Sequence, residues 1–131
     1  MTSAVGFSAY PSTTTGYDVG AIVQFDTVVT NIGGFYSGDL GVFICPIDGI
    51  YLFPISLYTD NAREMGAKIV RDGSKIHISW SDGVDNIQSA VVAVTECLAT
   101  QTVWVECTGD GKELIGRRNG HYFYCINSNP F

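Results

Sequence analysis

One stretch of the chain, from Phe25 to Phe53, restricts the fold more than any other part of the sequence. Aromatic residues recur along it at fixed gaps, together with one asparagine and one glycine: Phe25, Asn31, Tyr36, Phe43, Gly49, Tyr51 and Phe53. Tyr51 and Phe53 alternate and so share one face of an extended strand, while Ile50 and Leu52 occupy the other face. A strand that is apolar on both faces must be covered on both. The stretch therefore predicts a β-strand with one face on the core and the other against an oligomer partner or a ligand.

The remainder of the chain predicts further short strands separated by turn residues, and no amphipathic helix. The expected strands span residues 5–10, 22–25, 27–30, 42–45, 50–59, 90–97, 103–107 and 121–126, with a hairpin over 68–76. In that hairpin a two-residue Asp72-Gly73 turn would place Arg71 opposite Ser74 and Ile69 opposite Ile76. This regular spacing is typical of a sandwich or a barrel.

Pro54 lies inside the long strand predicted for residues 50–59. Proline has no backbone N–H to donate to a neighbouring strand and is usually found at an edge or a bulge. We therefore expect a bulge or an unpaired ladder position at Pro54. The alternative is that the strand ends there, so that only residues 50–53 need cover on both faces.

The spacing from Phe25 to Phe53 resembles the signature of the globular head domain of complement component 1q, which shares its jelly roll with the tumour necrosis factor family. Phe7-Ser8-Ala9 matches the motif of that family's first strand, and the V-x-V-T-E-C and V-W-V-E runs within 91–106 resemble compact single-domain members from invertebrates, notably bivalves. The resemblance implies an all-β, ten-stranded jelly-roll β-sandwich. It would form a single domain over residues 1–131, with a core from about residue 5 to 127. No Gly-X-Y run is present, so we expect no collagen-like region.

Charge and motifs disfavour several classes of function. The chain of 131 residues has a net charge of −6, which argues against nucleic acid as a partner, and it contains no apolar stretch long enough to span a membrane. Only His77 and His121 could act as histidine bases, and neither lies in a recognisable catalytic motif. We therefore expect a binding protein that is not an enzyme.

The four cysteines form no C-x-x-C pair, which disfavours a zinc site. The topology implied by the resemblance places the strand ending at Cys45 beside the strand carrying Cys107. These two are therefore the candidates for a disulfide, with Cys97 and Cys125 free. Four buried thiols are the alternative.

The resemblance also implies a homotrimer, in which the sheet of the first, long and final strands faces the threefold axis. Six aromatic residues are expected in the core or at this trimer contact: Phe7, Tyr51, Phe53, Tyr122, Phe123 and Tyr124. A basic loop carrying Arg117 and Arg118, with Lys112 and His121 nearby, is the candidate ligand-binding site, because arginine pairs well with phosphate and carboxylate. Asp82 and Asp85 are candidate calcium ligands, although solvated turns would use the same residues. No other cofactor is expected.

The function that the resemblance implies is recognition in innate immunity. The chain would be secreted and would bind microbial surface polysaccharide, lipopolysaccharide or other carbohydrates. Two alternatives remain open, a structural protein of extracellular matrix or biomineral and a cytokine-like receptor ligand. Residues 1–16 lack the basic start and long apolar run of a secretion signal, so either a removed signal or a cytosolic protein fits them.

Overall fold

The computed structural model describes residues 4–12, 20–59, 65–81, 87–108 and 122–128. Within these residues the chain forms strands and no helix. The strands are β1 (Ala4–Tyr10), β2 (Thr27–Ile32), β3 (Tyr36–Ser37), β4 (Val42–Ile44), β5 (Gly49–Thr59), β6 (Met65–Arg71), β7 (Ser74–Ser81), β8 (Ile87–Cys97), β9 (Thr102–Thr108) and β10 (Tyr122–Ser128).

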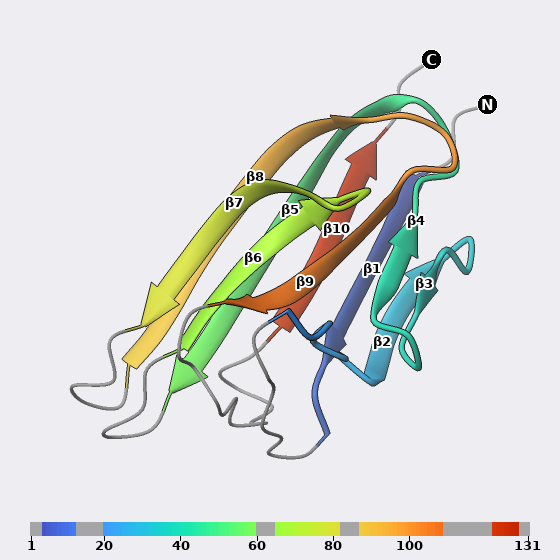
Figure 1. The fold of residues 1–131 in the computed structure, drawn as a ribbon. Helices are drawn as coiled ribbons and strands as arrows, with labels where there is room; N and C mark the ends of the chain where they lie inside the picture. Colours follow the sequence, from blue (N-terminus) through green and yellow to red (C-terminus); the bar gives the residue numbers. More distant parts are fainter. Residues whose placement is uncertain (1–3, 13–19, 60–64, 82–86, 109–121, 129–131) are drawn as a thin grey trace.

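Two five-stranded antiparallel sheets lie face to face (Figure 1). One has the order β2-β1-β10-β5-β8, here called the inner sheet, and the other has the order β3-β4-β9-β6-β7, here called the outer sheet. The predicted all-β jelly-roll sandwich is confirmed. Sequence reasoning missed β3, which has only two residues, and the strand expected at 22–25 forms a single bridge from Ile22 to Glu106.

Aromatic side chains fill the core between the sheets. Phe123 of β10 is fully buried, and its ring lies 4.9 Å from that of Phe7 and 5.5 Å from that of Phe25. Tyr36 stacks on Phe7 at 4.1 Å, and Tyr51 is buried with Phe53 on β5. Of the six aromatics singled out in the sequence, the structure therefore places Phe7, Tyr51, Phe53 and Phe123 in the core. The side chains of Tyr122 and Tyr124 lie outside the description.

The strand β5 contains Pro54 without a bulge. Its pairing with β8 runs unbroken from Gly49 opposite Cys97 to Thr59 opposite Ile87. In the pairing with β10, by contrast, Leu52 lies opposite Ile126 and Ile55 lies opposite Phe123, in one register. Phe53 and Pro54, which lie between them on β5, are not part of this ladder. Of the two outcomes expected at Pro54, the unpaired ladder position is the one found, and the proline ring lacks the N–H that this ladder would need.

The β6–β7 hairpin has the predicted turn but not the predicted register. Asp72 and Gly73 both have positive φ angles, and Arg71 lies opposite Ser74 as expected. Ile69, however, lies opposite His77, so the expectation that it faces Ile76 is wrong. Ile76 is the extra residue of a bulge in β7, and it packs against the core from there.

Candidate recognition surfaces

Three of the segments that join the strands leave the sandwich at the same end. The strands β5, β7 and β9 all end there (Figure 1). Their last residues have partners on neighbouring strands: Thr59 lies opposite Ile87, Ser81 opposite Met65, and Thr108 opposite Gly66. Tyr122 opposes Ser56 near that end, so the segment between Thr108 and Tyr122 both starts and finishes there. This loop end is therefore where the predicted basic site and the predicted calcium site attach to the fold.

The candidate residues themselves lie outside the described part of the chain. This holds for the four basic-site residues, which are Lys112, Arg117, Arg118 and His121, and for the two candidate calcium ligands, Asp82 and Asp85. Among the residues that the structure does describe, no group of three or more His, Cys, Asp or Glu side chains could hold a metal ion. The role of the candidate residues in binding therefore stays a prediction.

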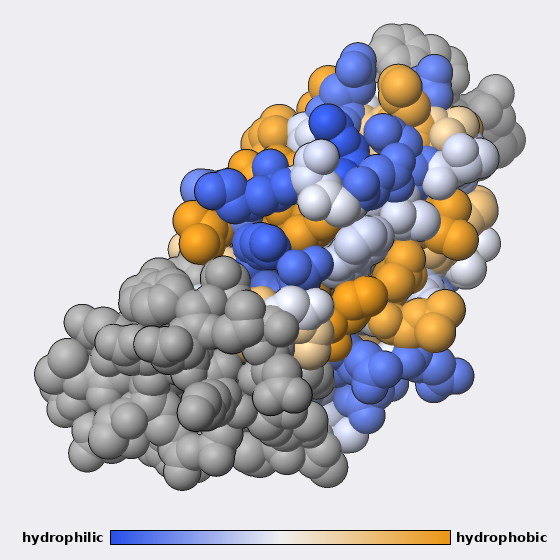
Figure 2. Space-filling view, in the orientation of Figure 1, coloured by the Kyte–Doolittle hydropathy of each residue, from blue (hydrophilic) through white to orange (hydrophobic). Residues whose placement is uncertain are grey.

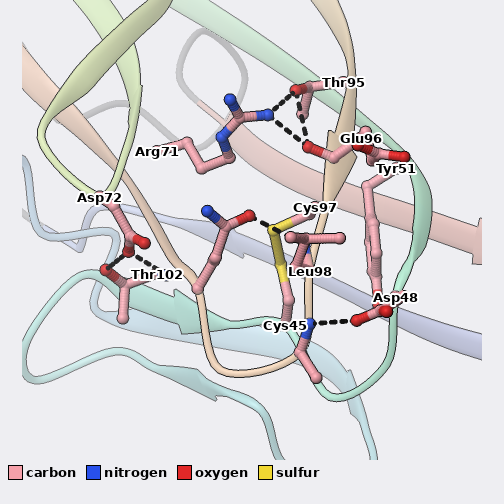
Figure 3. The surroundings of a disulfide bond; sticks show 12 residues. Cys45, Asp48, Tyr51, Arg71, Asp72, Thr95, Glu96, Cys97, Leu98 and Thr102 are labelled. Atoms are coloured by element: carbon pink, nitrogen blue, oxygen red, sulfur yellow. Dashed lines mark hydrogen bonds between the residues drawn. A yellow bond between two sulfur atoms is a disulfide. The ribbon is translucent and has the colours of Figure 1, made fainter.

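The opposite end of the sandwich is closed by a disulfide and by side chain to backbone hydrogen bonds (Figure 3). Cys45, just after β4, is bonded to Cys97 at the end of β8, and Cys107 and Cys125 are buried and form no disulfide. The predicted Cys45–Cys107 pairing is therefore wrong, although β4 and β9 are neighbours as expected. Because they run antiparallel, the N–H of Cys45 bonds to the carbonyl of Gln101, and Cys107 lies six residues further along β9, about 20 Å away.

Polar contacts continue this closure around the disulfide. Arg71 reaches from β6 of the outer sheet to β8 of the inner sheet, where its Nη1 donates to Thr95 Oγ1 at 2.8 Å and to the Glu96 carbonyl. Asp48 accepts a bond from the N–H of Ala99 at 2.7 Å. Asp72 accepts from both the N–H and the hydroxyl of Thr102, which lowers the pKa of this carboxyl. An end tied down in this way suits a structural role better than recognition.

The outward face of the inner sheet is apolar and open. Ile50 and Leu52 on β5 are 56% and 37% exposed, and Val92 and Val94 on the adjacent β8 are 51% and 62% exposed. Leu52 lies directly opposite Val94, and Pro54 opposite Val92, so these side chains form one patch, here called the β5–β8 patch. A contiguous exposed patch of this kind marks an interaction surface.

Half of this patch could be predicted from the sequence. We inferred the second apolar face of β5 from Ile50 and Leu52 in the sequence. We did not predict that β8 also has an apolar face turned outward. The run Ala90-Val91-Val92-Ala93-Val94 carries the missing signal, because it is also apolar at consecutive positions.

Comparison with known proteins identifies the fold and the family. The family model described as "C1q domain" matches residues 6–124. The chain belongs to the C1q-domain family. Among solved structures it is similar to the globular domain of zebrafish complement 1qA, with a TM-score of 0.78 and 17% identity over 95% of this chain and 99% of that one.

Two further structures share this C1q fold at similarly low identity. Murine APRIL matches with a TM-score of 0.75 and 14% identity, over 95% of this chain and 99% of that one. Eiger TNF from S. frugiperda matches with a TM-score of 0.76 and 11% identity, over 99% and 97% of the two chains. At these identities the likeness concerns the fold alone.

Membership of the C1q-domain family sets the class of function. Domains of the C1q and tumour necrosis factor type are binding domains without enzymatic activity, and they form trimers. C1q-domain proteins are typically secreted. Within the described residues no helix is long and apolar enough to cross a membrane.

Proposed function

We propose that this chain is a secreted recognition module that assembles as a homotrimer and binds anionic polymers of microbial surfaces, such as lipopolysaccharide or acidic polysaccharide. The observation that carries the proposal is the β5–β8 patch, which lies on the outward face of the inner sheet. Trimer formation would cover that patch and would leave the loop end of every protomer open. Three copies of a weak site on one rigid body then bind a repetitive polymer by avidity.

The loop end supports the placement of the ligand. Both strand ends that flank residues 109–121 lie at this end, away from the disulfide and its hydrogen bonds. Loops held by a rigid sandwich are a common place for recognition. The proposal assigns Arg117 and Arg118 to direct contact with phosphate or carboxylate groups, with Lys112 and His121 adding nearby positive charge or donors.

The double variant Arg117→Ala/Arg118→Ala tests this assignment. We expect it to keep the parent's assembled mass and to lose affinity for lipopolysaccharide by about tenfold or more, because hydrogen bonds to charged groups contribute about 1.5–3 kcal/mol. Surface plasmon resonance at several salt concentrations measures the loss, in calcium and again in EDTA. The dependence of binding on salt should also weaken in the variant.

Two variants make the result specific. Lys75→Ala removes an exposed positive charge from β7 near the disulfide end, and it should bind like the parent. Arg117→Lys/Arg118→Lys keeps the positive charge but loses the planar guanidinium group. An affinity between those of the parent and the double alanine variant would show that paired hydrogen bonds from the guanidinium contribute to binding. Equal binding by the parent and the double alanine variant at every salt concentration would remove these arginines from the site.

A further inference from the structure

A second arrangement of side chains stands on the outward face of the outer sheet. Trp104 lies on β9, the middle strand of that sheet, and its direct neighbours across the ladders are Val42 on β4 and Val70 on β6. Core residues of β9 alternate with it at Val103 and Val105, so Trp104 points away from the core. It is half-buried nonetheless.

The burial of Val70 indicates where the indole of Trp104 lies. It belongs to the same outward row as Trp104, yet none of its surface is exposed. Trp104 is the large side chain directly opposite, so we infer that the indole lies across Val70 and keeps part of one ring face toward solvent. Such a flat aromatic surface is the common partner of an apolar ligand face.

Charged groups border this aromatic surface on one side. The indole N–H of Trp104 donates to Glu106 Oε2 at 3.0 Å, and Lys68 Nζ lies 3.3 Å from Glu106 Oε1. The side chains of Lys68 and Glu106 are 30% and 20% exposed, so solvent reaches both. Each carboxylate oxygen can accept a second bond and the ammonium has further N–H groups to donate, so the pair can still bind hydroxyls.

The outward face of the outer sheet carries many polar residues, unlike the β5–β8 patch. Figure 2 views the molecule in the orientation in which β6 and β9 cross in front of β5 and β10, and hydrophilic and intermediate residues fill the middle of this face. Hydrophobic residues gather toward its borders. In the proposed trimer the inner sheet is covered, so the face carrying Trp104 stays accessible.

We propose that Trp104, Glu106 and Lys68 form a subsite for a neutral sugar ring. The apolar face of the ring stacks on the indole, and neighbouring hydroxyls donate to Glu106 and accept from Lys68. Residues two apart on one strand are about 7 Å apart, so a ring over Trp104 also reaches Glu106. Because the charges of Glu106 and Lys68 cancel, the subsite favours a neutral hydroxylated ligand over the anionic groups assigned to Arg117 and Arg118.

This inference rests on the proposed function and deepens it, because it adds a second class of contact to the same polymer. The two can still be separated by experiment. The probes are methyl β-glucoside and methyl β-galactoside, each of which has an apolar ring face formed by axial hydrogens.

Titration followed by the two tryptophan indole N–H signals in a ¹⁵N correlation spectrum is the direct test. We expect the Trp104 signal, assigned with the Trp104→Phe and Trp80→Phe variants, to shift with at least one glycoside while the Trp80 signal stays in place. Glu106→Gln should weaken binding about tenfold, the effect of losing a charge-assisted bond, and Trp104→Ala should abolish it. Trp80→Phe and Ile44→Ala, the latter on β4 of the same face, should bind like the parent.

Two results would overturn the subsite. One is a Trp104 signal that neither glycoside moves at concentrations well above the millimolar range. The other is unchanged glycoside binding by Glu106→Gln and Trp104→Ala when both keep the parent's spectrum elsewhere. If lipopolysaccharide binding in the same preparations still depends on Arg117 and Arg118, the proposed function stands while the subsite falls. If the glycosides shift the Trp104 signal but lipopolysaccharide binding does not depend on Arg117 and Arg118, the subsite stands and the arginine site falls.

Discussion

Replacing both Cys45 and Cys97 by alanine is expected to lower the free energy of unfolding by about 4 kcal/mol. The bridge closes a long loop, with a sequence separation of 52 residues, and loop closure of that length restricts the unfolded chain by roughly this amount. Typical domains have only about 5–15 kcal/mol in total. The bridge also joins the end of β8 in the inner sheet to the residue after β4 in the outer sheet, so its loss releases one end of the sandwich.

Urea denaturation followed by circular dichroism measures this loss, at one fixed protein concentration because assembly also contributes to stability. Cys107→Ala is the matched control, since it removes a buried thiol that is in no disulfide and keeps the bridge. Alkylation without reductant must be done in denaturant, because burial raises the pKa of Cys125 to about 12 and leaves its thiol unreactive in the folded chain. Two labelled thiols are expected; four labelled thiols, or a control as unstable as the double variant, would contradict the pairing.

The second large effect is expected at the β5–β8 patch, where Val94→Lys should turn a trimer into a monomer. Val94 is the most exposed residue of the patch, and it lies opposite Leu52. A lysine there is solvated in the monomer, but in a trimer three copies would be desolvated at once, each at a cost of several kcal/mol. Since about 1.4 kcal/mol changes a dissociation constant tenfold, the assembly should be lost at micromolar concentration.

Ile44→Lys provides the matched control for Val94→Lys. Ile44 is also an exposed aliphatic residue on a strand, at 49%, but it belongs to β4 of the outer sheet. The control should keep the mass of the parent, and both variants should keep its far-ultraviolet circular dichroism. If Val94→Lys assembles as the parent does, the β5–β8 patch is not the contact.

Local patterns in the sequence were sufficient for most of the strands. Alternation around Tyr51 and Phe53 and the Asp72-Gly73 turn each depend on residues close together in the chain, and the structure has the elements that they predict. The family spacing from Phe25 to Phe53 added the jelly-roll fold, and its aromatic residues meet in one core.

Relations between distant strands were harder to predict. Cys45 and Cys107 are on neighbouring strands, but the antiparallel direction of those strands separates them and brings Cys97 to Cys45 instead. The bulge at Ile76 shifts the partner of Ile69 by one residue, and no turn residue marks it in the sequence. The neighbours of Trp104 are equally distant in the sequence, because its place opposite Val70 depends on the pairing of β9 with β6.

A trimer built through the inner sheet would present three loop ends to a polymer. Light scattering after size exclusion, at micromolar concentration of the unmodified chain, tests it most directly. We expect three times the chain mass of 14.2 kDa, about 43 kDa, at every concentration in that range. A single species of 14.2 kDa would leave the β5–β8 patch exposed in solution and would contradict the proposed trimer.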